Sequence, residues 1–316
     1  MRYTTISFPD LGIKINPGYQ LDLGFVSVYY YGLLIAFGIL LATVYGLRRG
    51  KQFGLSQDNI LDGALAIIPF AIICARAYYC IFAWDEYKAN PIEVFYIWNG
   101  GLAIYGGVIG AAIGIVVYCK IKKLSLGAAL DLTSLGFLIG QSIGRWGNFF
   151  NREAHGEETT SFLRMGILDS YTGVTKYYHP TFLYESVWNL MGFILLHFLS
   201  KRRRYDGQVA LGYVAWYGLG RTFIEGLRAD SLYWGDLRVS QVLAAVSCLT
   251  AGIILLCQFV RSHDPANLYV NRVAAAQAAA EAEATAMEAV TEEAVEEEAA
   301  TEETVDQEAV AENNEV

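Results

Sequence analysis

The run LGFVSVYYYGLLIAFGILLATVYGL, residues 23–47, contains no charged side chain. A transmembrane helix needs about 20 consecutive, mostly apolar residues, so this run is long enough to cross a bilayer. Two further stretches, 101–119 and 239–260, are equally free of charge. Hydrophobic residues make up 54% of the chain and the mean hydropathy is +0.31, which favours an integral membrane protein over two soluble domains.

Four other apolar stretches hold one or two acidic or basic residues each and complete a set of seven predicted spans: 60–84, 124–144, 180–200 and 207–227. We therefore predict an all-α, polytopic membrane protein with seven transmembrane helices. Basic side chains follow the first, third, fifth and seventh spans, at 48–51, 120–123, 201–204 and 261. Alternate connections lie on one side of a membrane, and the positive-inside rule assigns that side to the cytoplasm. The N-terminus is then outside and the C-terminus is cytoplasmic.

The charge of the chain is unevenly distributed. From Glu281 onward there are 14 acidic residues and no basic one, so the rest of the chain has 23 basic against 18 acidic side chains. We predict a seven-span transmembrane domain at 1–263 and an acidic, Ala/Glu-rich, disordered cytoplasmic tail at 264–316. The mildly basic membrane part suits anionic lipid headgroups. Nucleic acid is not an expected partner, because no basic stripe is interleaved with aromatic residues.

The five cysteines lie in or at the ends of apolar segments and form no CxxC pair. This pattern indicates small buried side chains, and neither a metal site nor a cofactor is predicted from it.

Charged residues inside the predicted spans are the first candidates for function. Each costs at least ~2.5 kcal/mol on insertion scales, so such a residue normally faces protein or a water-filled cavity. Glu225 follows Arg221 by four residues and precedes Arg228 by three, which places all three on one helical face. One glutamate neutralises only one of these arginines, so the remaining positive charge indicates a site for an anion.

Arg76 is also predicted to lie inside a span. It could form a neutralising pair with Asp131 or Glu185, and the sequence leaves this alternative open.

The polar run GRWGNFFNREAHG, residues 144–156, lies where the fourth span meets its outer connection. Asn148 and Asn151 follow Arg145 at successive intervals of three, so they share a face if the helix continues. A guanidinium group matches the geometry of phosphate oxygens. The connection that follows, up to His179, is long enough to hold a small folded element. These residues predict an outer-face site for a phosphate-bearing membrane substrate, with a simple polar helix cap as the alternative.

At this point the chain resembles the bacterial phosphatidylglycerol–prolipoprotein diacylglyceryl transferases. The resemblance rests on VYYYGLLIA at 28–36, GGLAIYGGVIG at 100–110, GRWGNFFNREAHG at 144–156, HPTFLYE at 179–185 and YGLGRTFIEGLR at 217–228. It covers about residues 1–260 and excludes the acidic tail. The family transfers the diacylglyceryl group of phosphatidylglycerol to the thiol of a lipobox cysteine, forming a thioether and releasing glycerol phosphate. This reaction is the first step of bacterial lipoprotein maturation.

The resemblance implies three kinds of partner: phosphatidylglycerol, prolipoprotein signal peptides with a lipobox cysteine, and membrane lipids. It also implies the bacterial cytoplasmic membrane as the location, with the active site toward the outer face. The implied catalytic residues are Arg145, Arg221 and Tyr105. The implied phosphatidylglycerol-binding residues are Arg145, Asn148, Asn151, Glu153, Gly156, Tyr31, Tyr217, Glu225 and Arg228.

Tyr105 is a departure from part of the family, because some members have a histidine in this loop. Tyrosine, with a reference pKa near ~10, is a poorer general base than histidine near neutral pH. Tyr105 therefore remains a candidate catalytic residue that acts by hydrogen bonding, and no general base is assigned. His179 and Glu185 match the family motif HPTFLYE and are expected to be structural.

Two other functions, and one variant mechanism of the transferase, fit the residues less well. A transporter for an anionic solute also has charged residues within its spans, but the chain shows no convincing internal repeat. An intramembrane serine protease needs a Ser–His pair, and no serine lies in a nucleophile-like motif. A covalent step through Cys74 or Cys80 is unnecessary for the transferase, because the substrate carries its own thiol.

Overall fold

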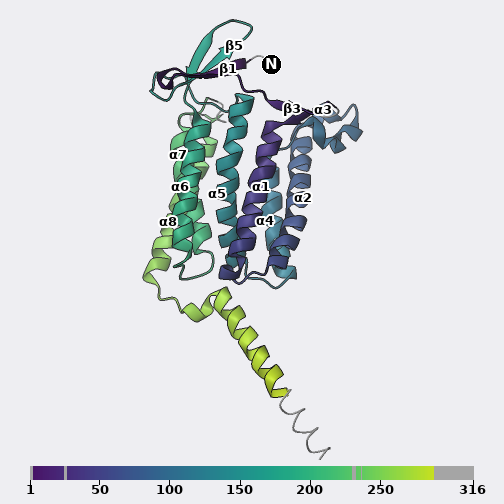
Figure 1. The fold of residues 1–316 in the computed structure, drawn as a ribbon, viewed down its shortest axis with the longest axis vertical. Helices are drawn as coiled ribbons and strands as arrows, with labels where there is room; N and C mark the ends of the chain where they lie inside the picture. The colour runs from purple at the N-terminus through teal and green to yellow at the C-terminus, as the bar shows by residue number, and fades with distance from the viewer. Residues whose placement is uncertain (1–2, 25–26, 230–232, 236, 288–316) are drawn as a thin grey trace, which may run out of the picture. The chain divides into compact units, whose positions relative to one another are not determined.

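The computed structural model describes residues 3–24, 27–229, 233–235 and 237–287. Long helices form a bundle, and small β-sheets lie at one end of it (Figure 1). The helices are α1 (Tyr30–Arg49), α2 (Gln57–Phe82), the short α3 (Trp84–Tyr87), α4 (Ile104–Ile121), α5 (Leu126–Asn151), α6 (Thr181–Ser200), α7 (Gln208–Glu225) and α8 (Val239–Val260). The 3-10 helices are η1 (Pro9–Leu11), η2 (Gly50–Phe53), η3 (Pro91–Phe95), η4 (Ile97–Asn99) and η5 (Pro265–Asn267).

Six of these helices are long and apolar enough to cross a membrane: α1 extended through η2, α2, α4, α5, α6 and α8. The protein is thus a polytopic, mostly helical membrane protein. Helix α7 was predicted as a further span, but it is not among the six. Arg221 and Glu225 near its end and Gln208 at its start lower its hydropathy. It nevertheless packs against α5, α6 and α8, so protein contacts rather than lipid surround its charged residues.

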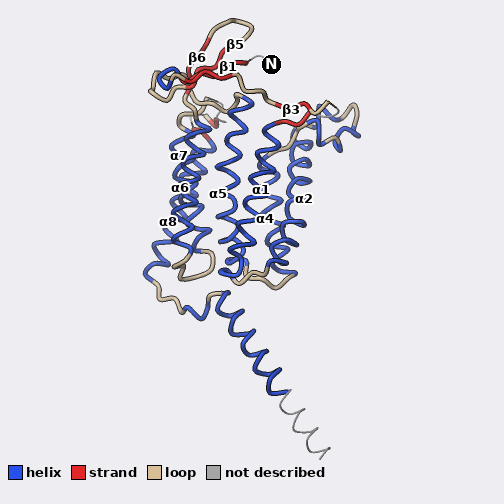
Figure 2. The backbone as a smooth tube through the Cα atoms, in the orientation of Figure 1, coloured by secondary structure: helices blue, strands red, loops and turns tan. Residues whose placement is uncertain are grey.

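The sheets are an addition to the predicted all-α fold (Figure 2). Strands β1 (Tyr3–Phe8), β2 (Ile13–Ile15), β5 (Met165–Asp169) and β6 (Thr175–Tyr178) form an antiparallel sheet in the order β2-β1-β5-β6. Two hairpins complete the set, β3 (Gln20–Asp22) with β4 (Ser27–Tyr29) and β7 (Tyr233–Trp234) with β8 (Leu237–Arg238). Ile6 and Phe8 are buried and alternate with the part-exposed Thr5 and Ser7, which is the two-residue period of a strand.

An apolar cluster joins the four-stranded sheet to the bundle. Ile6 of β1 and Ile167 of β5 pack with Phe149 near the end of α5 and Phe182 at the start of α6. The connection between α5 and α6 therefore folds back on the N-terminal strands, and the ends of these two helices are held under the sheet.

The predicted basic clusters gather at the other end of the bundle. Arg49 Nη2 donates to Ser200 Oγ at 2.9 Å, and Lys122 Nζ lies 2.9 Å from Asp62 Oδ2. The basic clusters that follow the first, third and fifth predicted spans lie where α1, α4 and α6 end. This arrangement is what the alternation of basic connections predicts for one side of a membrane.

The chain divides into two compact units, residues 1–269 and Val270–Val316. Within the predicted disordered tail, residues 269–287 are helical, and 288–316 lie outside the described residues.

Candidate functional site

The buried carboxylate of Glu185 lies at the centre of a cluster of arginines near the sheet-bearing end of the bundle. Its Oε2 is 2.7 Å from Arg145 Nη2 of α5, and its Oε1 is 2.6 Å from Arg221 Nη1 of α7. Arg228 Nη1 lies 3.5 Å from the same Oε1. On the other side of the Arg221 guanidinium, Nη2 lies 2.6 Å from Glu225 Oε2. We call these five residues the arginine cluster.

The arginine cluster holds more basic than acidic side chains. Three guanidinium groups meet two carboxylates, so these five side chains together carry one positive charge. Glu225 and Glu185 have only 2% and 4% of their side chains exposed, whereas Arg145 keeps 24% exposed. An anion arriving from outside the cluster therefore meets Arg145 first. Buried ion pairs of this kind hold side chains in one geometry more than they stabilise the fold.

A tryptophan pair sets the register between α6 and α7 that brings Glu185 to Arg221. Trp188 Nε1 donates to the Trp216 carbonyl at 3.0 Å, and Trp216 Nε1 donates to the Trp188 carbonyl at 2.9 Å. The two rings are stacked with centroids 4.5 Å apart. Each indole lies over a glycine of the opposite helix, Gly220 or Gly192, where a Cβ would overlap it.

A second set of bonds fixes α6 against α5. Ser142 Oγ donates to the Ser186 carbonyl at 2.9 Å, and Ser186 Oγ donates to the Ser142 carbonyl at 2.7 Å. Trp146 Nε1 donates to Ser186 Oγ at 3.2 Å. Because Ser186 follows Glu185 and Trp146 follows Arg145, these bonds hold the two charged side chains opposite one another.

The polar run at residues 144–156, which we call the signature run, is connected to the arginine cluster by hydrogen bonds of its amide side chains. Arg145 Nη1 donates to Asn148 Oδ1 at 3.2 Å. Asn148 Nδ2 and Asn151 Nδ2 each donate to Glu153 Oε1 at 3.2 Å. Helix α5 ends at Asn151, and Arg152 takes the left-handed conformation with φ 54°. This reversal is uncommon for a residue other than glycine, and it turns Glu153 back toward the amides.

Gly156 lies against the end of α7 and has no room for a side chain. Its N–H donates to the His179 carbonyl at 2.9 Å, and it forms a β-bridge with Arg228. A Cβ would come within 2.6 Å of the His179 Cβ and 2.7 Å of the Leu227 carbonyl. The glycine thus lets the connection after α5 close directly on the segment that carries Arg228.

The predicted tyrosines occupy different places. The Tyr31 ring of α1 packs on Gly147 of α5. Gly147 belongs to the signature run, so Tyr31 borders that run. Tyr217 lies one turn before Arg221 on α7 and is stacked on Tyr213 at 5.8 Å. Tyr105 is 54% exposed in the first turn of α4, and none of its described contacts joins it to the arginine cluster.

Arg76 has a different environment from the one predicted for it. It pairs with neither Asp131 nor Glu185, and it is buried with 6% exposed. Its guanidinium group donates at 2.7–3.0 Å to backbone carbonyls of the connection between α2 and α4, those of Glu93, Val94, Gly100 and Gly101. Arg76 therefore fixes the path of this connection.

Asp131 has a structural role at the opposite end of the bundle. Its Oδ2 accepts from Gly207 N at 2.9 Å and its Oδ1 accepts from Ala210 N at 2.9 Å. The carboxylate of α5 thus caps the N-terminus of α7, where backbone N–H groups otherwise lack partners.

Sequence reasoning took Glu185 as structural, yet this residue joins both catalytic candidates, Arg145 and Arg221. The available signal was an acidic side chain in an otherwise apolar span. Among the described residues, no group of three or more His, Cys, Asp or Glu side chains is placed to hold a metal ion.

The fold and the arginine cluster together define a polytopic membrane protein with a positive site at one end of its helix bundle. The family model described as prolipoprotein diacylglyceryl transferase matches residues 19–257. The chain belongs to the prolipoprotein diacylglyceryl transferase family, as its motifs predicted.

Its relatives are similar over nearly their whole length. A phosphatidylglycerol–prolipoprotein diacylglyceryl transferase of Listeria monocytogenes is 42% identical over 260 residues, covering 80% of this chain and 94% of the relative. The enzyme of that name from Bacillus licheniformis is 44% identical, covering 76% and 92%. The one from Enterococcus faecalis is 43% identical, covering 78% and 91%. The arginine cluster and the signature run lie within the matched region.

Proposed function

We propose that this protein transfers the diacylglyceryl group of phosphatidylglycerol to the lipobox cysteine thiol of prolipoproteins. The reaction forms a thioether, releases glycerol phosphate and is the first step of lipoprotein maturation. Family membership supports the class of reaction. The arginine cluster, with three guanidinium groups and two carboxylates, supports the assignment of the phosphate site.

In this reaction the sulfur attacks the glyceryl carbon that bears the phosphate. A carbon–sulfur bond forms, the carbon–oxygen bond breaks, and its electron pair goes to the phosphate oxygen. A free cysteine thiol titrates near ~8.5, so forming the thiolate is a modest task. Stabilising the charge that develops on the leaving phosphate is the larger one, and a positioned donor contributes on the order of 3–4 kcal/mol to such a step.

Arg145 and Arg221 are the residues that we assign to this stabilisation. Arg145 is the more exposed of the two and can turn its second donor edge toward a headgroup. Arg221 is held on both sides by carboxylates, Glu185 and Glu225, at 2.6 Å each. A guanidinium held in place before substrate arrives needs no reorganisation during the reaction, which is the source of its effect.

Glu185 acts in this scheme as a positioning residue. It lies within 2.7 Å of both catalytic arginines and keeps their like charges close together. Without it, Arg145 and Arg221 would repel each other, and the phosphate would meet them one at a time.

The remaining candidates surround the headgroup in the proposal. Asn148, Asn151 and Glu153 offer amide donors and carboxylate acceptors for the glycerol hydroxyls. Gly156 holds this network beside Arg228, and Glu225 orients Arg221 and Arg228. Tyr31 and Tyr217 border the site on α1 and α7, and Tyr105 on α4 is a candidate for contact with the incoming peptide.

The proposed location is the bacterial cytoplasmic membrane, with the arginine cluster toward the outer face. The basic clusters at the opposite end support this orientation through the positive-inside rule. Helix α7 would be the seventh span. The signal peptide with its lipobox cysteine and the lipid substrate would then both reach the site from the outer leaflet.

A direct assay tests this proposal. The purified protein is incubated with phosphatidylglycerol and a lipobox peptide, and mass spectrometry follows the peptide cysteine. We expect a gain of one diacylglyceryl group and release of one glycerol phosphate per modified peptide. A peptide whose cysteine is replaced by serine is the matched control. No modification under conditions in which the Bacillus licheniformis relative works would overturn the proposal.

A further inference from the structure

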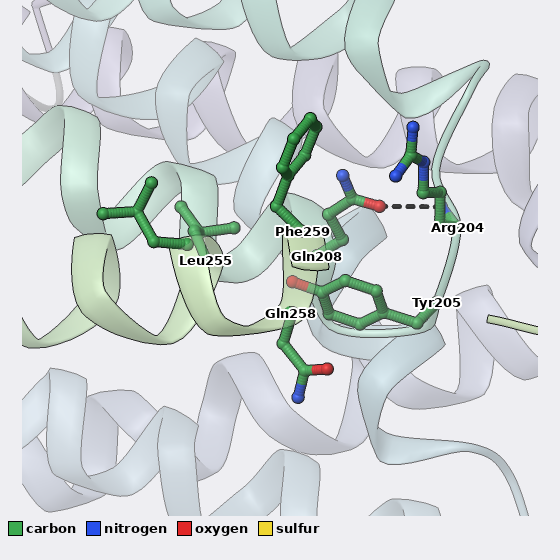
Figure 3. A pocket seen from close by; sticks show the side chains of 7 residues that line it. Arg204, Tyr205, Gln208, Leu255, Gln258 and Phe259 are labelled. Carbon is green, nitrogen blue, oxygen red and sulfur yellow. Dashed lines mark hydrogen bonds between the residues drawn. The ribbon is translucent and has the colours of Figure 1, made fainter. Parts of the chain in front are cut away.

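A small pocket lies between the start of α7 and the end of α8, at the opposite end of α7 from the arginine cluster (Figure 3). Its volume is about 220 Å³. Thirteen residues separate Gln208, in its wall, from Arg221, so about 20 Å of helix lies between this pocket and the proposed active site. The pocket is therefore a separate place on the molecule.

Tyr205 forms the enclosed part of the polar wall. Its hydroxyl is buried and has no hydrogen-bond partner among the described residues. Because that oxygen is enclosed by protein, a ligand in the pocket meets the side of the Tyr205 ring and not its hydroxyl.

A positive charge lies on the polar side of the pocket. The Arg204 guanidinium carbon is 5.1 Å from the centre of the Phe259 ring, on the pocket side of the loop. Its neighbour Arg203 points elsewhere, over Phe53 at 4.2 Å. Gln208 Oε1 already accepts from the Arg204 backbone N–H at 2.7 Å, the dashed line in Figure 3, so its amide nitrogen is the end left for a ligand.

The nearest acidic side chain of this loop does not neutralise the pocket. Asp206 Oδ2 accepts from the backbone N–H of Tyr269 at 2.9 Å and from Ser125 Oγ at 3.4 Å. It is thus tied to other elements, and the pocket keeps the charge of Arg204.

The other wall is apolar and continues onto a face that lipid would cover. Leu255 and Phe259 of α8 line the pocket with Leu256, and both Leu256 and Phe259 are 70% exposed. Helix α8 is one of the six helices apolar enough to span a membrane. The pocket can take a phosphodiester group but not a whole phospholipid, so the acyl chains of a bound lipid would lie along α8.

We propose that this pocket binds an anionic phospholipid from the leaflet opposite the active site. The phosphate lies against Arg204 and the amide nitrogen of Gln208, and one acyl chain lies along Leu255, Leu256 and Phe259. Nearby Lys201 and Arg202 are exposed and add positive potential, which favours an anionic over a zwitterionic headgroup. A free phosphate ion would leave the apolar wall without a partner.

Photo-crosslinking tests this site. The full-length protein is placed in phosphatidylcholine nanodiscs with a small fraction of phosphatidylglycerol that carries a diazirine in one acyl chain. After irradiation, peptide mapping locates the adducts. We expect adducts on the end of α8, around Leu255–Phe259, distinct from adducts near the arginine cluster, and weak labelling there by the matching phosphatidylcholine probe.

Arg204→Gln should reduce the α8 adducts about tenfold, because a charge-assisted contact is lost. The matched control is Arg202→Gln, in the same basic run but outside the pocket. It lowers only the surrounding potential and should reduce the adducts by less than about twofold. Transfer activity and thermal unfolding confirm the fold of each variant, and Gln208→Leu replaces Arg204→Gln if that variant unfolds. Equal labelling by both probes, adducts unaffected by the substitutions, or loss of adducts on adding inorganic phosphate would overturn the proposal.

Discussion

Two environments of buried arginine lie in the same bundle and differ in what balances their charge. Arg76 is enclosed by backbone carbonyls of one connection and stacked 5.1 Å from the Tyr87 ring centre. The arginine cluster on α5, α7 and the residues after α7 is balanced by two carboxylates and keeps Arg145 partly exposed. The first environment saturates one guanidinium with neutral acceptors, and the second leaves the Arg145 guanidinium partly exposed to solvent.

We propose that this difference separates a structural arginine from a functional one. Carbonyl groups satisfy the donors of Arg76, and its substitution should release the connection that they belong to. Carboxylates position Arg145 and Arg221 without using all of their positive charge. Substitutions in the arginine cluster should therefore affect transfer more than folding, and those at Arg76 should do the reverse.

The largest effect is expected from Arg145→Ala and Arg221→Ala. Each should reduce kcat/KM at least about 100-fold, because a donor to the leaving phosphate is lost. Expression should remain, and Arg202→Ala, an exposed basic residue at the other end, is the control. Steady-state transfer to a lipobox peptide measures the effect. Retained activity in both variants would mean that the phosphate site lies elsewhere.

Glu185→Gln should reduce transfer about tenfold or more by loosening both catalytic arginines. It also leaves three positive charges with one carboxylate, so the melting temperature should fall. Glu185→Asp keeps the charge and should recover part of kcat. A loss of stability without a change in kcat would assign Glu185 to folding alone.

Arg76→Gln should destabilise the fold by about 3 kcal/mol or more, since several charged hydrogen bonds to buried carbonyls are lost. Proteolysis in the connection between α2 and α4 should become faster, and activity should fall only with the folded fraction. Thermal unfolding and limited proteolysis measure this. If activity disappears while both remain unchanged, Arg76 belongs to the catalytic machinery.

Gly220→Ala should cost about 1–3 kcal/mol, because the new Cβ overlaps the Trp188 indole and forces α6 and α7 apart. Transfer should fall as Glu185 moves away from Arg221. Gly252→Ala is the matched control, since it lies in α8 with nothing within 4 Å of the new Cβ. Equal behaviour of the two variants would contradict the role of the tryptophan pair.

The smallest effect is expected for a variant without cysteines, with alanine at 74, 80, 119, 248 and 257. All five cysteines are free thiols, and the proposed reaction uses the thiol of the peptide. Turnover should stay within about twofold. Loss of turnover in a folded variant would restore the covalent route through an enzyme cysteine.

Much of the bundle could be predicted from the sequence, because length and hydropathy alone decide whether a helix can span a membrane. The spacing of Arg221, Glu225 and Arg228 was equally readable, since residues three and four apart on a helix are neighbours. These are local properties, and the structure brings the same side chains together.

Contacts between helices could not be predicted in this way. The pairing of Glu185 with Arg145 and Arg221 depends on the register between α6 and its neighbours, which the tryptophan pair and its glycines set. For Arg76 the sequence left pairing with an acidic residue open, because backbone carbonyl acceptors carry no sequence signal. The strand containing Ile6 was missed because a short alternating segment gains its stability only from pairing with β5.

The central claim is that the arginine cluster stabilises the leaving phosphate and does more than bind the lipid. The most direct test is the single-turnover rate of transfer in Arg145→Ala at saturating phosphatidylglycerol, compared with the unaltered protein. We predict a rate about 100-fold lower that added lipid does not restore, because an interaction made in the transition state has been removed. Recovery of the full rate at high lipid concentration would contradict the claim and leave Arg145 with binding alone.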